Sequence, residues 1–451
     1  MNTRERTMKR TPQINSAMLW IVVWIFASSS VSAQQQTWSQ FLGPQGESES
    51  VQAKPPIKWD KSNYRWEADI PGIGWSSPVH DGKHIWLTSA DVKKASEEQI
   101  EKKRKGVQFA EMKTVAGSIT LRAVCVDLES GKVIHNIELE KTESPELIHP
   151  MNSYASPTAA ISGEKVVCHF GSYGTWCLET KTGKTLWTSK YSVDHSVGPG
   201  SSPVVANDKA VLVFDGIDKQ FVAAVSMSDG KEVWKTPRPK MVSDNGEYQK
   251  AYSTPLVVKV GAKKQLVVPG AQWIAAYDID SGKEIWRVLH GQGFSTTPMA
   301  SFEDGLVIFS TGFTRPNVVA IDPSGTGDVT KSHVKWTNRN GPTMPSMVTN
   351  GGKVYFVSDR SILHCVDAKT GETINQKRLK GNYSASPLLA GKNLYFSSRE
   401  GNVSVVKADE KLDVVATNDF GGKILASPMP YKDDLIFRVD SKLYRISKSV
   451  Q

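Results

Sequence analysis

A short frame of residues recurs along this chain of 451 residues and limits it to a repeat architecture. Its clearest copy runs from Trp273 to Trp286, where Ala276 stands two residues before Asp278, Gly282 four after it and Trp286 eight after it. Gly282 supplies the positive φ that a tight hairpin requires. The copy therefore predicts two short strands joined by a turn, with the tryptophan on the second strand.

The frame returns along the chain, with looser versions near Ala320 and between Val405 and Ala416. Its other clear copies begin at Cys125, Cys177, Ala224 and Cys365. A second marker, a small residue beside a proline, separates the copies and ends at Pro78, Pro157, Pro203, Pro255, Pro298, Pro345, Pro387 and Pro428. After a first interval of 79 residues the markers are 41 to 52 residues apart, a period typical of propeller blades. Eight markers predict an all-β fold, an eight-bladed β-propeller of four-stranded antiparallel blades.

The two ends of the chain complete each other in this arrangement. Residues 64–70 alternate like a strand, and Trp66 lies 12 residues before the first marker, which is the spacing between Trp286 and Pro298. The last repeat, in contrast, stops at Ile446 without an outer strand of its own. We therefore expect the N-terminal strand to close the ring, because closure removes the open edge of an incomplete blade.

The first 33 residues predict an export signal. Four basic residues precede an apolar run from Ala17 to Ala27, and Val31-Ser32-Ala33 has the small-x-small pattern of a signal peptidase site. We expect residues 1–33 to be removed and the mature protein to reside in the periplasm or cell envelope. The alternative is a retained anchor, but the run is about half of the ~20 residues that cross a bilayer.

Residues 34–58 are expected to form an N-terminal arm, and residues 59–451 the propeller. The charged segment 91–106 predicts an insertion with a surface helix in the first blade. The formal charge of +9 includes three units from the segment expected to be removed, and the remaining lysines are scattered through turns. The pattern does not favour nucleic acid as a partner. We expect a monomer that does not span the membrane after cleavage.

Three of the four cysteines, Cys125, Cys177 and Cys365, fill the slot that alanine occupies in other copies, which predicts small core residues. Cys168 is the exception, because the hairpin that joins it to Cys177 would set the two thiols opposite one another. Two interpretations stay open for an exported protein, a cross-strand disulfide or a pair of free thiols.

The frame Ala-x-Asp-x-x-x-Gly-Lys-x-x-Trp, with Ser-Pro between its copies, resembles the pyrroloquinoline quinone-like β-propeller repeat family over roughly residues 59 to 447. That family includes eight-bladed quinoprotein alcohol dehydrogenases and the non-catalytic propeller lipoprotein of the outer-membrane β-barrel assembly machinery. The stretches 38–44, 149–157 and 382–387 also resemble exported planctomycete-type propellers. The repeat stabilises the ring, because a tryptophan plane can stack on the glycine peptide of the neighbouring blade, and it carries no activity by itself.

The resemblance does not extend to the cofactor site of the dehydrogenases. There the quinone lies against a ring formed by two adjacent cysteines, beside a calcium ion and a catalytic aspartate. This chain has no adjacent cysteine pair and no Cys-x-x-Cys-His haem motif, so no site residue is carried over. We expect no catalytic residues, no metal, no cofactor and no tight binding of pyrroloquinoline quinone. The quinone with calcium is a cofactor only under the alternative of a quinoprotein.

The candidate ligand-binding residues lie just before the proline markers. These connections lead from one blade's outer strand to the next blade's inner strand and open on one rim of the central channel. The candidates are Trp75, His149, Asn152, Tyr154, His195, Lys250, Tyr252, Phe294, Asn382 and Tyr383. They either bind a ligand or plug the channel and pack on neighbouring blades. We expect replacement of His195, Lys250 or Asn382 to cost little stability, as at exposed loop positions.

Together these patterns predict an exported, non-catalytic binding or scaffolding protein of the cell envelope, with an envelope protein or polymer as its partner. The alternative is a quinoprotein-type oxidoreductase with an atypical site. A third hypothesis is a hydrolase or lyase that uses histidine and tyrosine side chains of the rim. A chromophore bound after addition of the quinone and calcium would favour the oxidoreductase.

Overall fold

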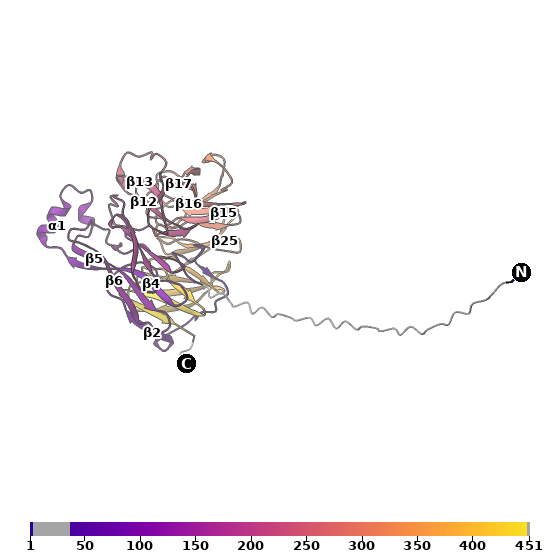
Figure 1. Cartoon of the computed structure of the whole chain (residues 1–451), viewed down its shortest axis with the longest axis horizontal. Coiled ribbons are helices and arrows are strands. Elements are labelled where there is room, and N and C mark those ends of the chain that lie inside the picture. The colour runs from indigo at the N-terminus through magenta and orange to yellow at the C-terminus, as the bar shows by residue number, and fades with distance from the viewer. Residues whose placement is uncertain (3–36, 449–451) are drawn as a thin grey trace. The chain divides into compact units, whose positions relative to one another are not determined.

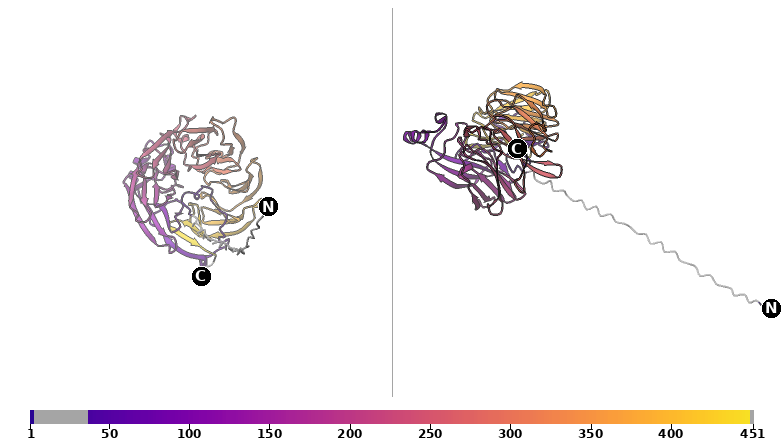
Figure 2. Two further views of the ribbon diagram at one scale, coloured as in Figure 1. Left: turned by 45° about the vertical axis from the view of Figure 1, so that its right-hand side comes forward. Right: turned by 90° about the horizontal axis from the view of Figure 1, so that it is seen from above.

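The structure, a computed structural model, describes residues 1–2 and 37–448. The expected cleavage site and nearly all of the expected signal segment lie outside these residues, as does the start of the arm. Eight sheets, antiparallel apart from two short added strands, stand around one axis in the described part (Figure 1; Figure 2, left view). The prediction of an all-β, eight-bladed propeller is confirmed.

The blades follow the chain in order, and each takes four strands. The first four blades consist of β3 (Val79–His80), β4 (His84–Lys94), β5 (Ala116–Asp127) and β6 (Val133–Thr142); β7 (Ala160–Ser162), β8 (Lys165–His169), β9 (Thr175–Glu179) and β10 (Thr185–Ser189); β11 (Val204–Ala206), β12 (Lys209–Asp215), β13 (Gln220–Ser226) and β14 (Glu232–Pro237); and β15 (Leu256–Val260), β16 (Lys263–Pro269), β17 (Trp273–Asp278) and β18 (Glu284–Leu289).

The remaining blades consist of β19 (Ser301–Glu303), β20 (Leu306–Ser310), β21 (Val318–Ile321) and β23 (Val334–Asn338); β24 (Val348–Asn350), β25 (Lys353–Val357), β26 (Ile362–Asp367) and β27 (Thr373–Arg378); β28 (Leu388–Ala390), β29 (Asn393–Ser397), β30 (Asn402–Lys407) and β31 (Val414–Asp419); and β32 (Met429–Tyr431), β33 (Asp434–Val439), β34 (Lys442–Ile446) and β2 (Tyr64–Asp69). Two short strands extend the fourth and seventh blades, β22 (Gly327–Asp328) beside β18 and β1 (Glu49–Ser50) beside β28.

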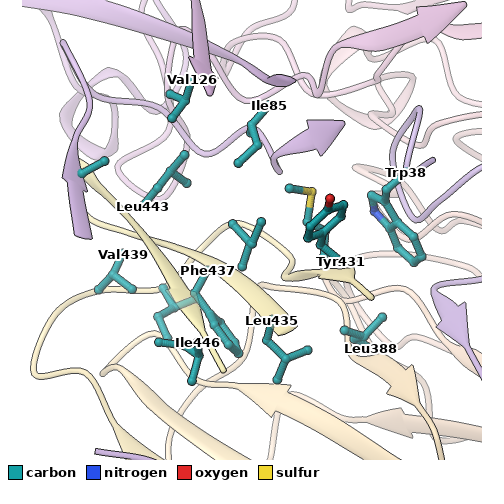
Figure 3. Packing of buried hydrophobic residues seen from close by; sticks show 14 of the residues in the cluster. Trp38, Ile85, Val126, Leu388, Tyr431, Leu435, Phe437, Val439, Leu443 and Ile446 are labelled. Atoms are coloured by element: carbon teal, nitrogen blue, oxygen red, sulfur yellow. The ribbon is translucent and has the colours of Figure 1, made fainter. Parts of the chain in front are cut away.

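Ring closure occurs as predicted, because β2 pairs with β34 as the outer strand of the eighth blade. The core behind this pairing joins the two ends of the ring. Figure 3 shows Phe437 and Leu443 of the eighth blade gathered with Ile85 and Val126 of the first. All four side chains are fully buried, so closure is sealed by apolar contact as well as by backbone hydrogen bonds.

Outer-strand tryptophans tie neighbouring blades together, as the repeat predicts. Each covers a turn glycine of the next blade so closely that a Cβ there would lie 2.5 to 2.7 Å from the indole. Each also donates its Nε1 hydrogen to a carbonyl of that blade. The tryptophan and glycine pairs are Trp66 with Gly131, Trp187 with Gly230, Trp234 with Gly282 and Trp336 with Gly371. Only glycine fits beneath these rings, which explains the fixed spacing of the frame.

Trp286, which ends the clearest copy of the frame, is an exception. Its Nε1 hydrogen bonds to Oε1 of Gln265 in its own blade, at 2.8 Å, and its side chain is fully buried. The cause lies in the next blade, where residues 327–328 form β22 and pair with the outer strand at Trp286 and Arg287. The fourth and fifth blades are therefore joined by an added strand, whereas the other joints described above use a turn with a glycine under the tryptophan.

A belt of hydroxyl groups surrounds the axis at the proline markers. At seven blade junctions a backbone N–H donates to a Ser or Thr hydroxyl of the next blade, at 2.9 to 3.0 Å. The acceptor side chains are Ser77, Thr158, Ser202, Thr254, Ser346, Ser386 and Ser427. Met299 holds the eighth position and has no hydroxyl. The small polar residue of the marker is thus a joint between inner strands.

Ser386→Ala should destabilise the propeller by about 1–3 kcal/mol, because it leaves the buried N–H of Ser346 without an acceptor. Ser386→Thr is the matched control and should be close to neutral, since Thr158 and Thr254 fill equivalent positions. Urea unfolding of the three proteins gives the comparison. Equal stability of the alanine and wild-type proteins would show that the belt is not a stabilising joint.

The arm enters the ring and contacts inner strands on different sides of it. Trp38 pairs with His80 of the first blade, and the carbonyl of Ser39 accepts from Ile161 N of the second at 2.6 Å. Leu42 packs in a cluster with residues of the fourth and fifth blades. Strand β1 then runs parallel to β28 of the seventh blade. Residues 38–50 therefore reach inner strands of the first, second and seventh blades and the core between the fourth and fifth.

The expectation that Cys168 and Cys177 lie opposite one another is wrong. Cys168 lies opposite Trp176, and Cys177 lies opposite Val167, so the two thiols are one residue out of register. Because strand side chains alternate between faces, Cys168 belongs to the core shared with the first blade and Cys177 to that shared with the third. All four cysteines are described, buried and free.

The predicted surface helix of the insertion is confirmed as α1 (Glu97–Arg104), which has no buried residue. Ser96 and Gln99 form a capping box at its start. The insertion extends beyond Gly106, however, through the 3-10 helix η2 (Ala110–Met112) to β5. Across the described residues, no helix has the length and apolar character needed to span a membrane.

Four fully packed histidines make the fold sensitive to acid. Burial lowers the pKa of His80, His195 and His364 to about 4 and that of His169 to about 3. In the unfolded chain the pKa of histidine is about 6.5, so below that pH the unfolded chain binds more protons and gains stability. The stability that the four neutral histidines contribute to the folded protein is fully present above pH about 6.5 and is lost as the pH falls toward 4.

The free energy of unfolding should therefore fall by several kcal/mol between pH 6.5 and 4.5, as measured by urea unfolding. His364, which stacks on Phe356 at 4.8 Å, offers a control. In His364→Phe the slope of stability against pH should be smaller by up to about 1.4 kcal/mol per pH unit, the contribution of one proton. An unchanged slope would mean that this imidazole is protonated in the folded protein.

Candidate functional site

The candidate site lies on the end of the propeller that we call the marker rim. Two kinds of loop meet there, the connections between blades that carry the proline markers and the loops between second and third strands. They hydrogen-bond to each other, as Arg399 N does to Asn382 O at 2.7 Å and Gln272 N to Gly293 O at 2.8 Å. The other strand turns form the opposite rim.

Four buried polar side chains form a clamp on the marker rim between the first and fourth blades. Its members are Lys113, Ser196, Glu247 and Lys250. The Ser196 hydroxyl donates to Glu247 Oε1 at 2.8 Å and accepts from the ammonium groups of Lys113, at 3.0 Å, and Lys250, at 3.3 Å. Lys250 also forms an ion pair with Glu247 Oε2. The clamp joins the first-blade insertion to two connections between blades.

The clamp is held together by one carboxylate between two cations. Burial raises the pKa of Glu247, but the hydrogen bonds from Lys250 and Ser196 outweigh it and keep the pKa below its ordinary value. Ser196 has a positive φ of 63°, a conformation that costs energy and that these contacts hold in place. Both carboxylate oxygens of Glu247 accept a hydrogen bond from a donor within the clamp. The arrangement is suited to fixing the loops rather than to activating the serine as a nucleophile.

The expectation that His195 and Lys250 are exposed is wrong. His195 is 4% exposed, and among the described residues neither of its ring nitrogens has a hydrogen-bond partner. Its ring fills the space beside Gly171, where a Cβ would lie 2.4 Å from Nε2. Lys250 is 6% exposed because it belongs to the clamp. Both residues fold back beneath the rim instead of projecting from it.

The three candidate tyrosines pack against the loops that contain them. Tyr154 and Tyr252 are buried, and their hydroxyls donate to Glu146 O and His195 O, both at 2.7 Å. Tyr383 is also buried and donates to Lys380 O at 2.8 Å. For these side chains the packing interpretation describes the contacts, because ring and hydroxyl are both engaged within the protein.

The segment of residues 149–152 lies toward the centre of the marker rim. Half-buried His149 accepts from Met151 N at its Nδ1, at 3.1 Å, and its pKa is lowered by burial and by the charges of Lys250 and Arg399. Asn152 donates to the carbonyls of Val197 and Pro199. A guanidinium nitrogen of Arg399, in the seventh blade, lies 3.0 Å from the sulfur of Met151. The segment is therefore held from two sides.

The remaining candidates are more open to solvent. Trp75 is half-buried, and its backbone N–H donates to Ala155 O at 3.1 Å. Phe294 is half-buried between the rings of Tyr248 and Phe313. Asn382 is exposed, as expected, and donates to Glu400 Oε1 at 2.8 Å. The candidates therefore form one central group near the clamp and separate positions around the rim.

Sequence reasoning missed most of the residues that organise this rim. Lys113 comes from the insertion, and no motif distinguishes it from the other lysines there. Glu247 and Lys250 are three residues apart, a spacing that could have signalled an ion pair. Arg399 occupies the turn between β29 and β30, where any polar residue would fit the repeat. Gln272, buried with a φ of 61°, likewise lies in an ordinary turn.

The residues of the rim do not fit the calcium and quinone site of the quinoprotein dehydrogenases. Calcium takes six to eight oxygen ligands, mainly carboxylates and carbonyls. The carboxylate of the clamp, Glu247, already accepts from Ser196 and Lys250. No group of three or more His, Cys, Asp or Glu side chains with the spacing of a metal site occurs within residues 37–448. We therefore derive no chemistry from a metal or a quinone.

The fold is an eight-bladed β-propeller built from the pyrroloquinoline quinone-like repeat. A family model described as outer membrane protein assembly factor BamB matches residues 76–268 and 315–415. The matched residues make up more than half of the chain, and the chain belongs to this family.

Relatives of the chain include assembly factors and one dehydrogenase. Outer membrane protein assembly factor BamB of Legionella pneumophila is 23% identical over 255 residues, 55% of this chain and 49% of that protein. BamB of Moranella endobia is 24% identical over 54% of this chain and 60% of its own length. Quinoprotein ethanol dehydrogenase of Pseudomonas aeruginosa is 31% identical over 140 residues, 28% of this chain and 22% of the enzyme. The chain thus spans about half the length of these assembly factors and less of the enzyme.

Solved structures support the fold. BamB of Moraxella catarrhalis superposes with a TM-score of 0.54 at 12% identity, covering 74% of this chain and 99% of that one. A europium-containing methanol dehydrogenase superposes with a TM-score of 0.61 at 10% identity, covering 90% of this chain and 89% of the enzyme. At these identities the likeness concerns the architecture alone.

Proposed function

We propose that this protein is an exported β-propeller of the cell envelope that binds or scaffolds an envelope protein on its marker rim. Family membership supports a role beside outer-membrane assembly, because the relatives that the chain matches over half its length are assembly factors. The leader-like start of the sequence supports export.

The observation that carries the proposal is the closed clamp. A catalytic rim would keep a nucleophile or base free to meet a substrate. Here the polar side chains of the clamp are buried and bonded to one another, which holds the surrounding loops in fixed positions. A rigid rim loses little conformational entropy when a partner covers it, so it is suited to binding.

Purification of the tagged protein from the cells that make it tests the proposal. We expect the protein in the envelope fraction, with its N-terminus at Gln34, and an envelope protein that co-purifies in stoichiometric amount. A cytoplasmic protein that begins at Met1 and has no partner would contradict the proposal.

The alternative, a quinoprotein-type oxidoreductase, keeps support from the dehydrogenase relative. Calorimetry with pyrroloquinoline quinone and calcium separates it from the binding protein. Because the rim offers no carboxylate set for calcium, we expect no tight complex. A dissociation constant below about 1 μM, equivalent to about −8.2 kcal/mol, would favour the oxidoreductase.

A further inference from the structure

The marker rim of the fifth to seventh blades carries a basic arc. Its members are Arg315, Arg339, Arg360, Arg378, Lys380 and Arg399. On the marker rim of these three blades the acidic residues are Asp359, Glu400 and Asp419, and each accepts a hydrogen bond locally. Asp359 accepts from the Thr343 hydroxyl at 2.6 Å, and Glu400 accepts from Asn382. The arc therefore has a clear excess of positive charge.

The opposite rim of the same blades holds most of their acidic residues, beside a similar number of lysines. All nine other acidic residues of the stretch 298–418 lie at its turns, where some of them pair with nearby lysines. They are Glu303, Asp304, Asp322, Asp328, Asp367, Glu372, Asp409, Glu410 and Asp413. All five arginines of the stretch lie on the marker rim. Arginine presents a planar fork that matches carboxylates and is enriched at protein interfaces.

The loops of the basic arc form one continuous surface. Arg378 donates to Arg360 O at 3.0 Å, and Thr343 reaches Asp359 in the neighbouring loop. Among the ion pairs of residues 37–448, none includes a member of the arc. Arg399 donates to the Ser384 hydroxyl and lies near the sulfurs of Met151 and Met344, which are weak acceptors. Its positive charge is not neutralised by these contacts.

An aromatic patch of Tyr248, Phe294 and Phe313 adjoins the arc at the fifth blade. Tyr248 is 45% exposed and Phe313 55% exposed, with ring centroids 4.9 and 5.7 Å from that of Phe294. Buried Gln272 holds the patch in place. Its side chain accepts from Val242 N at 2.6 Å and donates to Tyr248 O at 2.9 Å, and its N–H donates to the carbonyl before Phe294.

We propose that the basic arc and the aromatic patch together dock an extended acidic segment of a partner protein. Carboxylates of the segment pair with the arginines, and an apolar side chain enters the aromatic patch. The rings of Tyr248 and Phe313 each meet that of Phe294 edge to face, at 66° and 80°, and the exposed parts of Tyr248 and Phe313 are open to an apolar side chain of the segment. This inference rests on the proposed function and specifies the chemistry of its partner.

Fluorescence anisotropy with labelled peptides tests the docking surface. The probe is a peptide of alternating aspartate and phenylalanine, compared with versions in which lysine replaces aspartate or alanine replaces phenylalanine. We expect only the first peptide to bind, and more weakly in higher salt. The triple change Arg339→Glu, Arg360→Glu and Arg378→Glu and the single change Phe313→Ser should each weaken binding by about tenfold or more.

The matched control reverses three exposed lysines of the opposite rim, Lys132, Lys184 and Lys283, which should leave the affinity unchanged. Thermal melting confirms that each variant is folded. The proposal would be overturned if the peptide with alanine in place of phenylalanine, or a single-stranded oligonucleotide, bound as tightly as the aspartate and phenylalanine peptide. It would also be overturned if that peptide did not bind. If these peptides fail while an envelope protein still co-purifies with the chain, the proposed function stands and this docking surface does not.

Discussion

Glu247→Gln should destabilise the propeller by about 3–5 kcal/mol, the cost of removing one partner from a buried ion pair. The change preserves the shape of the side chain but leaves the ammonium groups of Lys113 and Lys250 buried without a counter-charge. The loops that they join belong to three parts of the chain, so the rim should loosen as the stability falls. Urea unfolding gives the free energy, and hydrogen exchange locates the loosening.

Two comparisons isolate the clamp. Glu400→Gln, at an exposed position on the same rim, should cost less than about 1 kcal/mol. Combining Glu247→Leu with Lys113→Met and Lys250→Met should recover much of the stability, because apolar residues of similar volume often replace buried ion pairs without loss. A small effect of Glu247→Gln would mean that the clamp does not hold the rim.

Removal of the closing strand should abolish cooperative unfolding. A chain that begins at Pro71 lacks β2, which leaves β34 as an open edge with Leu443 and Ile446 uncovered. It also lacks Trp66, which covers Gly131 and bonds to the first blade. Exposed apolar strand edges aggregate, so we expect a soluble yield far below that of a chain beginning at Thr37.

A synthetic peptide of residues 59–70 completes the test of closure. Added during refolding, it should restore a cooperative transition to the chain that begins at Pro71, because it can pair with β34 in the native register. Melting followed by circular dichroism measures the effect. An unchanged melting temperature in the shortened chain would show that the ring does not need this strand.

The sequence predicted the fold well because the repeat encodes local geometry. Each copy of the frame holds a glycine turn and an outer tryptophan in one hairpin, and because the hairpin repeats around the ring, the tryptophan of one copy, Trp234, lies over the glycine of the next, Gly282. The same spacing places Trp66 on a closing strand. The prediction failed where one residue decides the register. The strands that hold Cys168 and Cys177 pair one residue out of the expected register. The two side chains therefore point to opposite faces of the sheet.

The site was harder to predict because its contacts join residues far apart in the sequence. The proline markers correctly indicated which loops share a rim, and Asn382 is exposed as expected. His195 and Lys250 looked like surface residues because burial of polar side chains depends on partners such as Ser196 and Glu247 from other loops. The arginines of the basic arc follow no motif and gather only when three blades stand side by side.

Photo-crosslinking in the cells that make the protein tests most directly whether the marker rim is the working surface. A photoreactive phenylalanine analogue replaces Phe313 on the marker rim in one variant and Lys184 on the opposite rim in another. The proposed function predicts a crosslink to an envelope protein from position 313 and none from position 184. A partner crosslinked only from position 184 would contradict it.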